Sequence, residues 1–331
     1  MKNNFAKILT AYQEKAVFYR QLGIMLRSGI PIASALRQMQ SYTNLNEIIN
    51  ILVTYVEQGD LLSDAMKKTG YTFSKMEIAS ISAGEKSGNL PEVAGRLAGY
   101  FETLQNVKNK LISGMIYPAI LLHAAIIIPA IPLIFTKSVF AFFIRILPPF
   151  IIIYGAGFAI FFVKKTLSKP EMIKIRDALA LKLPAGFGKL FTKISVVRFL
   201  QAFNCLYSAG ISLIDSIRIS AESSGNKVIE EELLKAIPIV QEGKNLSYAF
   251  ARNPYLPGIV IDMFSTGEIS GNLDETLEKA AWHLQQEVDL AVEAILKIVP
   301  VVVYLIVALY VAMIIISFYA NYFSQINSLL E

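Results

Sequence analysis

Two glutamates in matching contexts are the first candidates for chemistry in this chain. Glu85 lies in the heptapeptide Gly-Glu-Lys-Ser-Gly-Asn-Leu (84–90), and Glu268 lies in Gly-Glu-Ile-Ser-Gly-Asn-Leu (267–273), 183 residues further on. The two signatures agree at six of seven positions, which indicates that the chain contains one domain twice. As exposed acids, the glutamates would contact a partner protein or a metal ion. The alternative is that the whole signature serves the structure.

The spacing within each signature favours the structural interpretation. Asn89 followed by Glu92 has the spacing of a helix N-cap and its capping-box partner, and the second copy repeats the pair. The glycines suit turn positions where a side chain would clash. Each signature therefore predicts a tight corner that directs a long helix towards the membrane. The candidates for this structural role or for partner binding are Gly84, Glu85, Gly88, Asn89, Glu92, Gly267, Glu268, Gly271, Asn272 and Glu275.

Other chemistries find little support in the sequence. The Gly-x-x-x-Gly spacing of the signatures lies among polar residues, so it does not predict a membrane dimer, and no Gly-Lys-Ser/Thr follows it as in an ATP-binding P-loop. Cys205 is the only cysteine, and we expect it to fill space in a helix. With His123 and His283 as the only histidines, neither a zinc site nor a nucleophile–base pair is expected. We expect no enzyme activity, cofactor or metal.

Three uncharged stretches predict membrane-spanning helices. Hydrophobic residues make up 54% of the chain and charged residues only 17%, which is typical of a membrane protein with large water-facing parts. The predicted spans are 111–135, 146–163 and 298–320, each long enough to cross a hydrocarbon layer of ~30 Å. His123 lies in the first span. Such a residue suggests a proton relay, but it has no charged partner in the spans, and a neutral histidine hydrogen-bonded between helices explains it as well.

The remaining segments complete an all-α integral membrane protein. Helical periodicity over 1–110 and 164–297 predicts two homologous helical-bundle domains, and no segment has sustained strand-like alternation. Lysines flank the spans on the side of both bundles, so the positive-inside rule places the bundles and the N-terminus in the cytoplasm. A short connection (136–145) and the C-terminal tail (321–331) then face the periplasm. The prolines of the first span are expected to kink it. No long basic run points to nucleic acid.

Several motifs together resemble the type II secretion system protein F family. They are the two signatures, the turns Ser-Gly-Ile-Pro-Ile (28–32) and Ala-Gly-Ile-Ser-Leu (209–213), and Leu183-Pro184 followed by Gly188-Lys189-Leu190. The resemblance covers about residues 12–322. The short N-terminus of this chain resembles that of the platform proteins of type IVb pili.

The resemblance implies a platform protein of the bacterial inner membrane that serves type II secretion or type IV pilus assembly. Such a protein would couple a cytoplasmic assembly ATPase to the extraction and polymerisation of pilin or pseudopilin subunits. Its expected partners are that ATPase, the pilins, other inner-membrane assembly proteins, the lipid bilayer and further copies of itself.

Two other classes remain open at the level of sequence. Duplicated halves are common in membrane transporters and channels, although their spans usually carry more polar residues than these. A membrane scaffold for a signalling complex would also fit duplicated cytoplasmic bundles.

Overall fold

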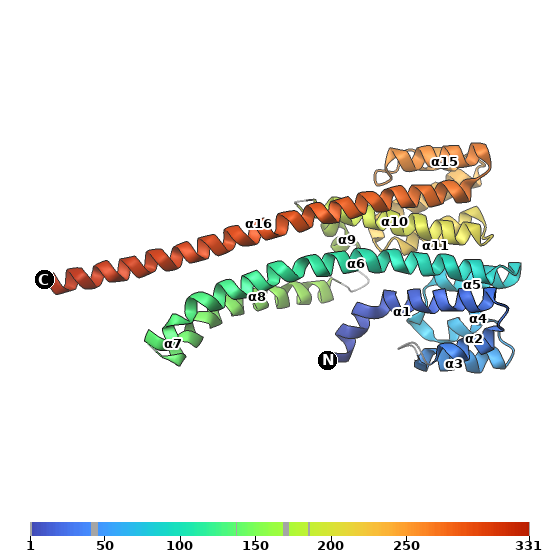
Figure 1. The fold of residues 1–331 in the computed structure, drawn as a ribbon. Coiled ribbons are helices and arrows are strands. Elements are labelled where there is room, and N and C mark those ends of the chain that lie inside the picture. Colours follow the sequence, from blue (N-terminus) through green and yellow to red (C-terminus); the bar gives the residue numbers. More distant parts are fainter. Residues whose placement is uncertain (1, 41–45, 137, 168–171, 185, 331) are drawn as a thin grey trace. The chain divides into compact units, whose positions relative to one another are not determined.

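The structure is a computed structural model that describes residues 2–40, 46–136, 138–167, 172–184 and 186–330. Within these residues every regular element is a helix, which confirms the all-α prediction (Figure 1). The chain divides into two compact units. The first contains Met1–Lys108 with Asp177–Asp289, and the second contains Asn109–Arg176 with Leu290–Glu331.

Each copy of the repeat is a series of helices, and the last helix of each copy is the longest. The first copy contains α1 (Lys2–Arg27), α2 (Ile32–Met39), α3 (Asn46–Glu57), α4 (Leu62–Lys68), the 3-10 turn η1 (Gly70–Thr72), α5 (Lys75–Ser87) and α6 (Leu90–Ile127). The second contains α9 (Ile173–Leu181), α10 (Phe187–Ser208), α11 (Leu213–Ser223), α12 (Lys227–Leu234), α13 (Ala236–Gln241), α14 (Leu246–Phe250), α15 (Gly258–Ser270) and α16 (Leu273–Leu330). Between the copies lie η2 (Ile128–Ala130), α7 (Pro132–Thr136) and α8 (Val139–Thr166).

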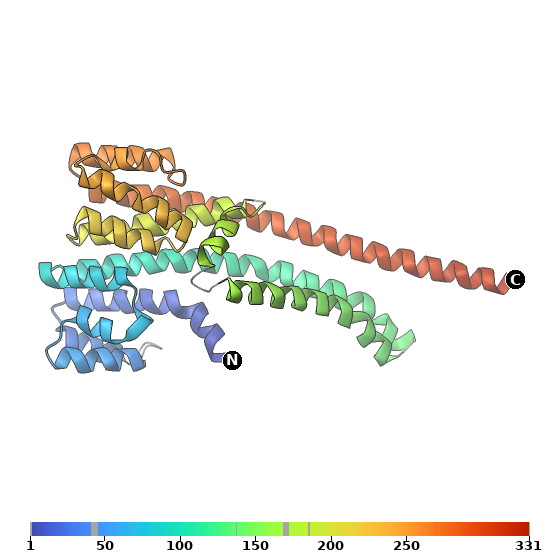
Figure 2. The same ribbon diagram turned by 180° about the vertical axis from the view of Figure 1, so that it is seen from behind.

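In the first unit, the two predicted bundles share a hydrophobic core. Helix α10 of the second copy packs against α5 of the first (Figure 2). Four small or apolar residues of α10 and its C-cap (Ala202, Cys205, Leu206 and Ala209) belong to the same buried cluster as the core of the first bundle. Cys205 is thus the buried space-filler that its sequence predicts, and burial raises the pKa of its thiol to about 12. The bundles therefore form one packed body.

A buried carboxylate links two helices of the first bundle. Glu77 on α5 is fully buried and accepts hydrogen bonds from Lys15 Nζ at 2.7 Å and Tyr19 Oη at 2.8 Å. It also accepts from the backbone N–H of Ser74 at 2.7 Å, and Ser74 Oγ accepts from Glu77 N, which completes a capping box at the start of α5. Burial first, and Glu77 second, raise the pKa of Tyr19 well above its usual value. The network fixes α1 against the N-terminus of α5.

The second unit contains the apolar ends of the long helices. Three helical segments are long and apolar enough to cross a membrane: Leu90–Phe135, Val139–Ala159 and Leu273–Ser317. Three membrane helices are thus confirmed as elements of the fold. The α-helix continues through Pro118 and gives way to a 3-10 turn around Pro129, while Pro132 is the first residue of α7, a position where proline is well tolerated.

Helix α8 begins earlier than the charge pattern suggests. It starts at Val139, inside the stretch 136–145 that the sequence assigns to a connection. Lys137 and Arg145 lie at the two ends of the predicted connection, but charges mark where a helix leaves the hydrocarbon layer and not where it ends. The assignment of 136–145 to the periplasm stays a prediction.

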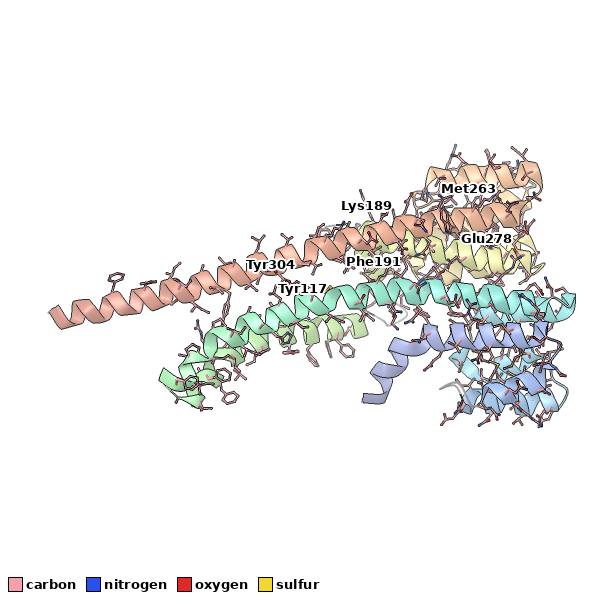
Figure 3. The ribbon with its side chains drawn as sticks, viewed as in Figure 1. Tyr117, Lys189, Phe191, Met263, Glu278 and Tyr304 are labelled. Carbon is pink, nitrogen blue, oxygen red and sulfur yellow. The ribbon has the colours of Figure 1, made fainter. Side chains whose placement is uncertain are left out.

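Two side-chain hydrogen bonds connect the helices of the second unit. His123 Nε2 lies 2.8 Å from Tyr154 Oη on α8, and its Nδ1 lies 2.7 Å from the carbonyl oxygen of Ala119. Because a carbonyl can only accept, Nδ1 carries the proton, and Nε2 of a neutral ring can then accept a hydrogen bond from the Tyr154 hydroxyl. Tyr117 and Tyr304 join α6 and α16 through their hydroxyls at 2.6 Å (Figure 3). The hydrogen bonds of His123 support its structural interpretation.

Candidate functional site

Glu85 caps the start of a helix that precedes it by more than twenty residues. Its Oε1 accepts a hydrogen bond from the backbone N–H of Leu62 at 2.6 Å, and its Oε2 accepts from that of Ser63 at 3.1 Å. These two N–H groups open α4, and the N-cap residue Leu61 has no side-chain acceptor to offer. The first four N–H groups of a helix have no partner within it and attract negative charge. The glutamate of the first signature therefore acts as a remote helix cap.

Glu268 makes the same contacts in the second copy. Its Oε1 accepts from the backbone N–H of Leu246, and its Oε2 accepts from both N–H and Oγ of Ser247 at 3.2 Å. The N-cap of α14 is Asn245, whose side chain makes no capping hydrogen bond there. Both carboxylates are thus occupied by backbone donors. The described residues also hold no group of three acidic, histidine or cysteine side chains suited to a metal ion.

The signature glycines fall into two pairs with different tasks. Gly88 and Gly271 have φ of +71° and +73° and end α5 and α15 in a left-handed conformation, as a turn requires. Gly84 and Gly267 instead lie inside these helices. A Cβ on Gly84 would be 3.2 Å from Leu90 Cα, so this pair allows each helix to approach the next one closely. The first pair ends helices in left-handed turns, whereas the second pair allows close packing between helices.

The predicted capping box after each signature is not formed as expected. Asn89 does precede α6, and its carbonyl accepts from Val93 N at 3.2 Å, but its own N–H donates to Gly84 O at 2.9 Å. The backbone N–H of Asn272 likewise donates to Ser270 Oγ at 3.4 Å. The tight turn thus uses the N–H that a capping box needs.

Glu92 and Glu275, the expected partners in the capping boxes, instead pair with basic side chains. Glu92 lies 3.8 Å from Arg27, and Glu275 accepts from Lys279 at 2.7 Å. Both ion pairs are exposed.

The remote caps give a first testable prediction. We expect Glu85→Ala and Glu268→Ala each to destabilise the protein by about 1–2 kcal/mol, since two helix N–H groups lose their acceptor. Glutamine, which keeps one acceptor oxygen, should cost less than alanine in both copies. Thermal unfolding in detergent measures the effect, and Glu275→Ala, which removes an exposed i,i+4 pair, is the matched control. Equal melting temperatures for Glu85→Ala, Glu268→Ala and the control would contradict the capping role.

A polar cavity of about 590 Å³ lies between the two copies within the first unit. Its walls come from α1 and α6 of the first copy and from α10 and α16 of the second, and Glu278 of α16 is among them (Figure 3). Basic, acidic and amide side chains all face it, including Arg27, Arg96, Gln201 and Gln285. Oε1 of Gln201 and of Gln285 is buried without a hydrogen-bond partner in the described protein. This cavity could not be predicted from local sequence patterns, because its lining comes from four separate helices.

The fold and its glycine corners define a class: a multi-pass membrane protein with a duplicated helical domain, each copy turning through such a corner into a helix that reaches a membrane span. The chain belongs to the family described as type II secretion system (T2SS), protein F, whose sequence profile matches residues 18–136 and again 199–320. One profile that matches twice, with starts 181 residues apart (199 − 18), confirms the duplication.

Similar proteins carry names from two related machineries. The type IV pilus assembly protein PilC of Myxococcus xanthus is 28% identical over 331 residues, covering 93% of this chain and 79% of the relative. PilC of Pseudomonas aeruginosa is 30% identical, covering 84% and 80%. The type II secretion system protein F of Vibrio cholerae is 29% identical, covering 80% and 71%. The resemblance seen in the motifs is therefore confirmed.

Proposed function

We propose that this protein is the inner-membrane platform on which a type IV pilus or type II secretion pseudopilus is assembled. It couples a cytoplasmic assembly ATPase to the extraction of pilin subunits from the membrane and to their polymerisation. The family and the names of its relatives support the platform role. The coupling is our inference, and further copies of this chain and other inner-membrane assembly proteins would complete the machine.

The observation that carries the proposal is the continuity of the helices that follow the glycine corners. Helix α6 runs unbroken from Leu90 to Ile127, and α16 runs unbroken from Leu273 to Leu330. Each begins with residues packed in the bundle core, such as Leu97 and Leu284, and each enters a segment apolar enough for the membrane. An α-helix transmits displacement along its axis because its backbone hydrogen bonds run from turn to turn. A force on the bundles would thus reach the bilayer.

The topology that suits this role places both bundles next to the ATPase. With the N-terminus in the cytoplasm and the C-terminus in the periplasm, the proposed cytoplasmic segments are 1–110 and 164–297. The lysines around the three spans support this orientation.

A flexible insertion at a corner tests the coupling. Four Gly/Ser residues inserted between Gly88 and Asn89, or between Gly271 and Asn272, should leave the platform in the membrane but abolish surface pili or secretion. The matched control carries the same insertion between Gly59 and Asp60, at another glycine of positive φ whose following helix, α4, does not reach the membrane. Protein level, thermal unfolding and sheared pili are measured in a strain that lacks its own platform. Normal pili from a stably folded corner variant would refute the coupling.

A further inference from the structure

Helix α9 presents apolar side chains on its outer face. Ile175 and Leu179 are 52% and 55% exposed and lie one turn apart, and Leu183, just beyond the end of the helix, is 47% exposed. A spacing of four residues places Ile175 and Leu179 on one side of the helix, and Leu183 follows in the chain after the helix has ended. We call Ile175, Leu179 and Leu183 the α9 stripe. Three large aliphatic side chains exposed together on so short a segment need an apolar partner.

The opposite side of α9 is fastened to the second bundle. Asp177 is buried, and its carboxylate accepts a hydrogen bond from the backbone N–H of Lys227 at 2.8 Å, at the start of α12. Asn226 donates from Nδ2 to the carbonyl oxygen of Asp177 at 3.2 Å. Asp177 is two residues from both Ile175 and Leu179, or about 200° around the helix. This attachment therefore holds the α9 stripe away from the bundle.

The position of α9 in the chain places it near the bilayer. Helix α8, which contains the second membrane span, ends at Thr166, and α9 begins at Ile173. Seven residues can extend at most about 25 Å. The start of α9 therefore lies within that distance of the end of a membrane helix.

The charge of the segment matches an anionic lipid surface. Residues 173–191 contain four basic side chains, Lys174, Arg176, Lys182 and Lys189, and one acidic side chain, which is the buried Asp177. Phe191, on the first turns of α10, is also exposed, and Figure 3 labels it with Lys189. An apolar stripe flanked by lysines and arginines is the pattern of a helix that lies in the membrane interface.

We propose that α9 is an interfacial helix whose α9 stripe is inserted at the boundary between lipid headgroups and acyl chains. Lys182 and Lys189, which follow the helix, contact the phosphates of anionic lipids. Through Asp177 and Asn226 the helix fastens the second bundle to the bilayer surface, in addition to the covalent attachment through α16. The proposal does not depend on pilus assembly, because it concerns only where this segment lies.

Spin labels on the full-length protein test this placement. In a Cys205→Ala background, a single cysteine is introduced at Leu179, at Leu183 or, as a control, at Ile24, which is equally exposed on α1. The labelled proteins are reconstituted in nanodiscs that contain phosphatidylglycerol, and collisions with oxygen and with a water-soluble nickel chelate are measured. We expect oxygen collisions to exceed nickel collisions at positions 179 and 183, and the reverse at position 24.

The other outcomes would overturn the proposal. Frequent nickel collisions at 179 and 183 would place the stripe in water, and few collisions with either reagent would place it against protein, such as a second copy or a partner. Equal insertion in phosphatidylcholine alone would refute the contact with anionic lipid. A Leu179→Trp variant in a Trp282→Phe background, with quenching by brominated lipid, repeats the test with a smaller probe. No quenching would also overturn it.

Discussion

Replacing Glu77 with alanine is expected to cause a large loss of stability in the first unit. The change leaves the ammonium of Lys15 without its buried partner at 2.7 Å and the hydroxyl of Tyr19 without its acceptor at 2.8 Å. Removing one partner of a buried ion pair typically costs about 3–5 kcal/mol. For a unit of this size that corresponds to a fall in melting temperature of roughly 6–20 °C. Thermal unfolding of the detergent-solubilised protein measures it.

The second copy supplies the design of the control. Val260 lies 183 residues after Glu77, is buried on α15, and needs no polar partner. The corresponding substitution in the first copy is the triple variant Lys15→Met, Tyr19→Phe and Glu77→Leu, which replaces all three polar groups together. Because no buried charge is then left unpaired, this variant should recover most of the stability that Glu77→Ala loses. A melting temperature of Glu77→Ala close to that of the wild type would show that the network is not important for stability.

Gly267→Ala is expected to open the second glycine corner, between α15 and α16. A Cβ at this position would overlap Thr276 Oγ1 and lie 3.0 Å from the backbone Cα of Leu273, so α15 and α16 must move apart. Overpacking of this kind costs typically about 1–3 kcal/mol, and the fixed backbone of Leu273 puts this site at the upper end. We expect a correspondingly lower melting temperature and a strong reduction of surface pili or secretion.

Two further variants separate the clash from a general effect of alanine. Gly99→Ala adds the same methyl group to α6 where no atom lies within 4 Å, and in a helix interior it should be neutral or stabilise by up to about 1 kcal/mol. Thr276→Ala in the Gly267→Ala background removes the overlapping hydroxyl and should restore part of the lost stability. If Gly267→Ala behaved like Gly99→Ala, the close approach of α15 and α16 would not matter.

The helical fold, the three spans and the duplication could be predicted from the sequence because each has a local pattern. Apolar runs identify the spans, and the repeated glycines at 88 and 271 mark the ends of helices. The role of Glu85 could not be predicted in the same way. Its donors are the N–H groups of Leu62 and Ser63, and backbone donors have no sequence signature. The one signal was the recurrence of Leu-Ser at 62–63 and 246–247, a similar distance before each signature.

The packing of the two bundles against each other also could not be predicted from the sequence. The periodicity of α10 indicates that residues such as Cys205 and Leu206 are buried, but not which helices cover them. In the structure they complete the core of the other copy. The Glu77 network is a similar case, since Lys15 and Tyr19 lie about sixty residues away in the chain. Local patterns specify the faces of helices, and long-range packing decides their partners.

The shared core has a consequence for how the protein is made. Synthesis of the first bundle is complete at Lys108. Ala202 and Cys205, which complete its core, are synthesised only about a hundred residues later. At roughly 5–20 residues per second, translation needs about 5–20 s to supply them. During that interval two membrane spans must be inserted. The apolar patch of the first bundle that α10 later covers is still exposed. Biosynthesis of this protein is therefore most vulnerable to aggregation and proteolysis in the middle of the chain, before the second copy arrives.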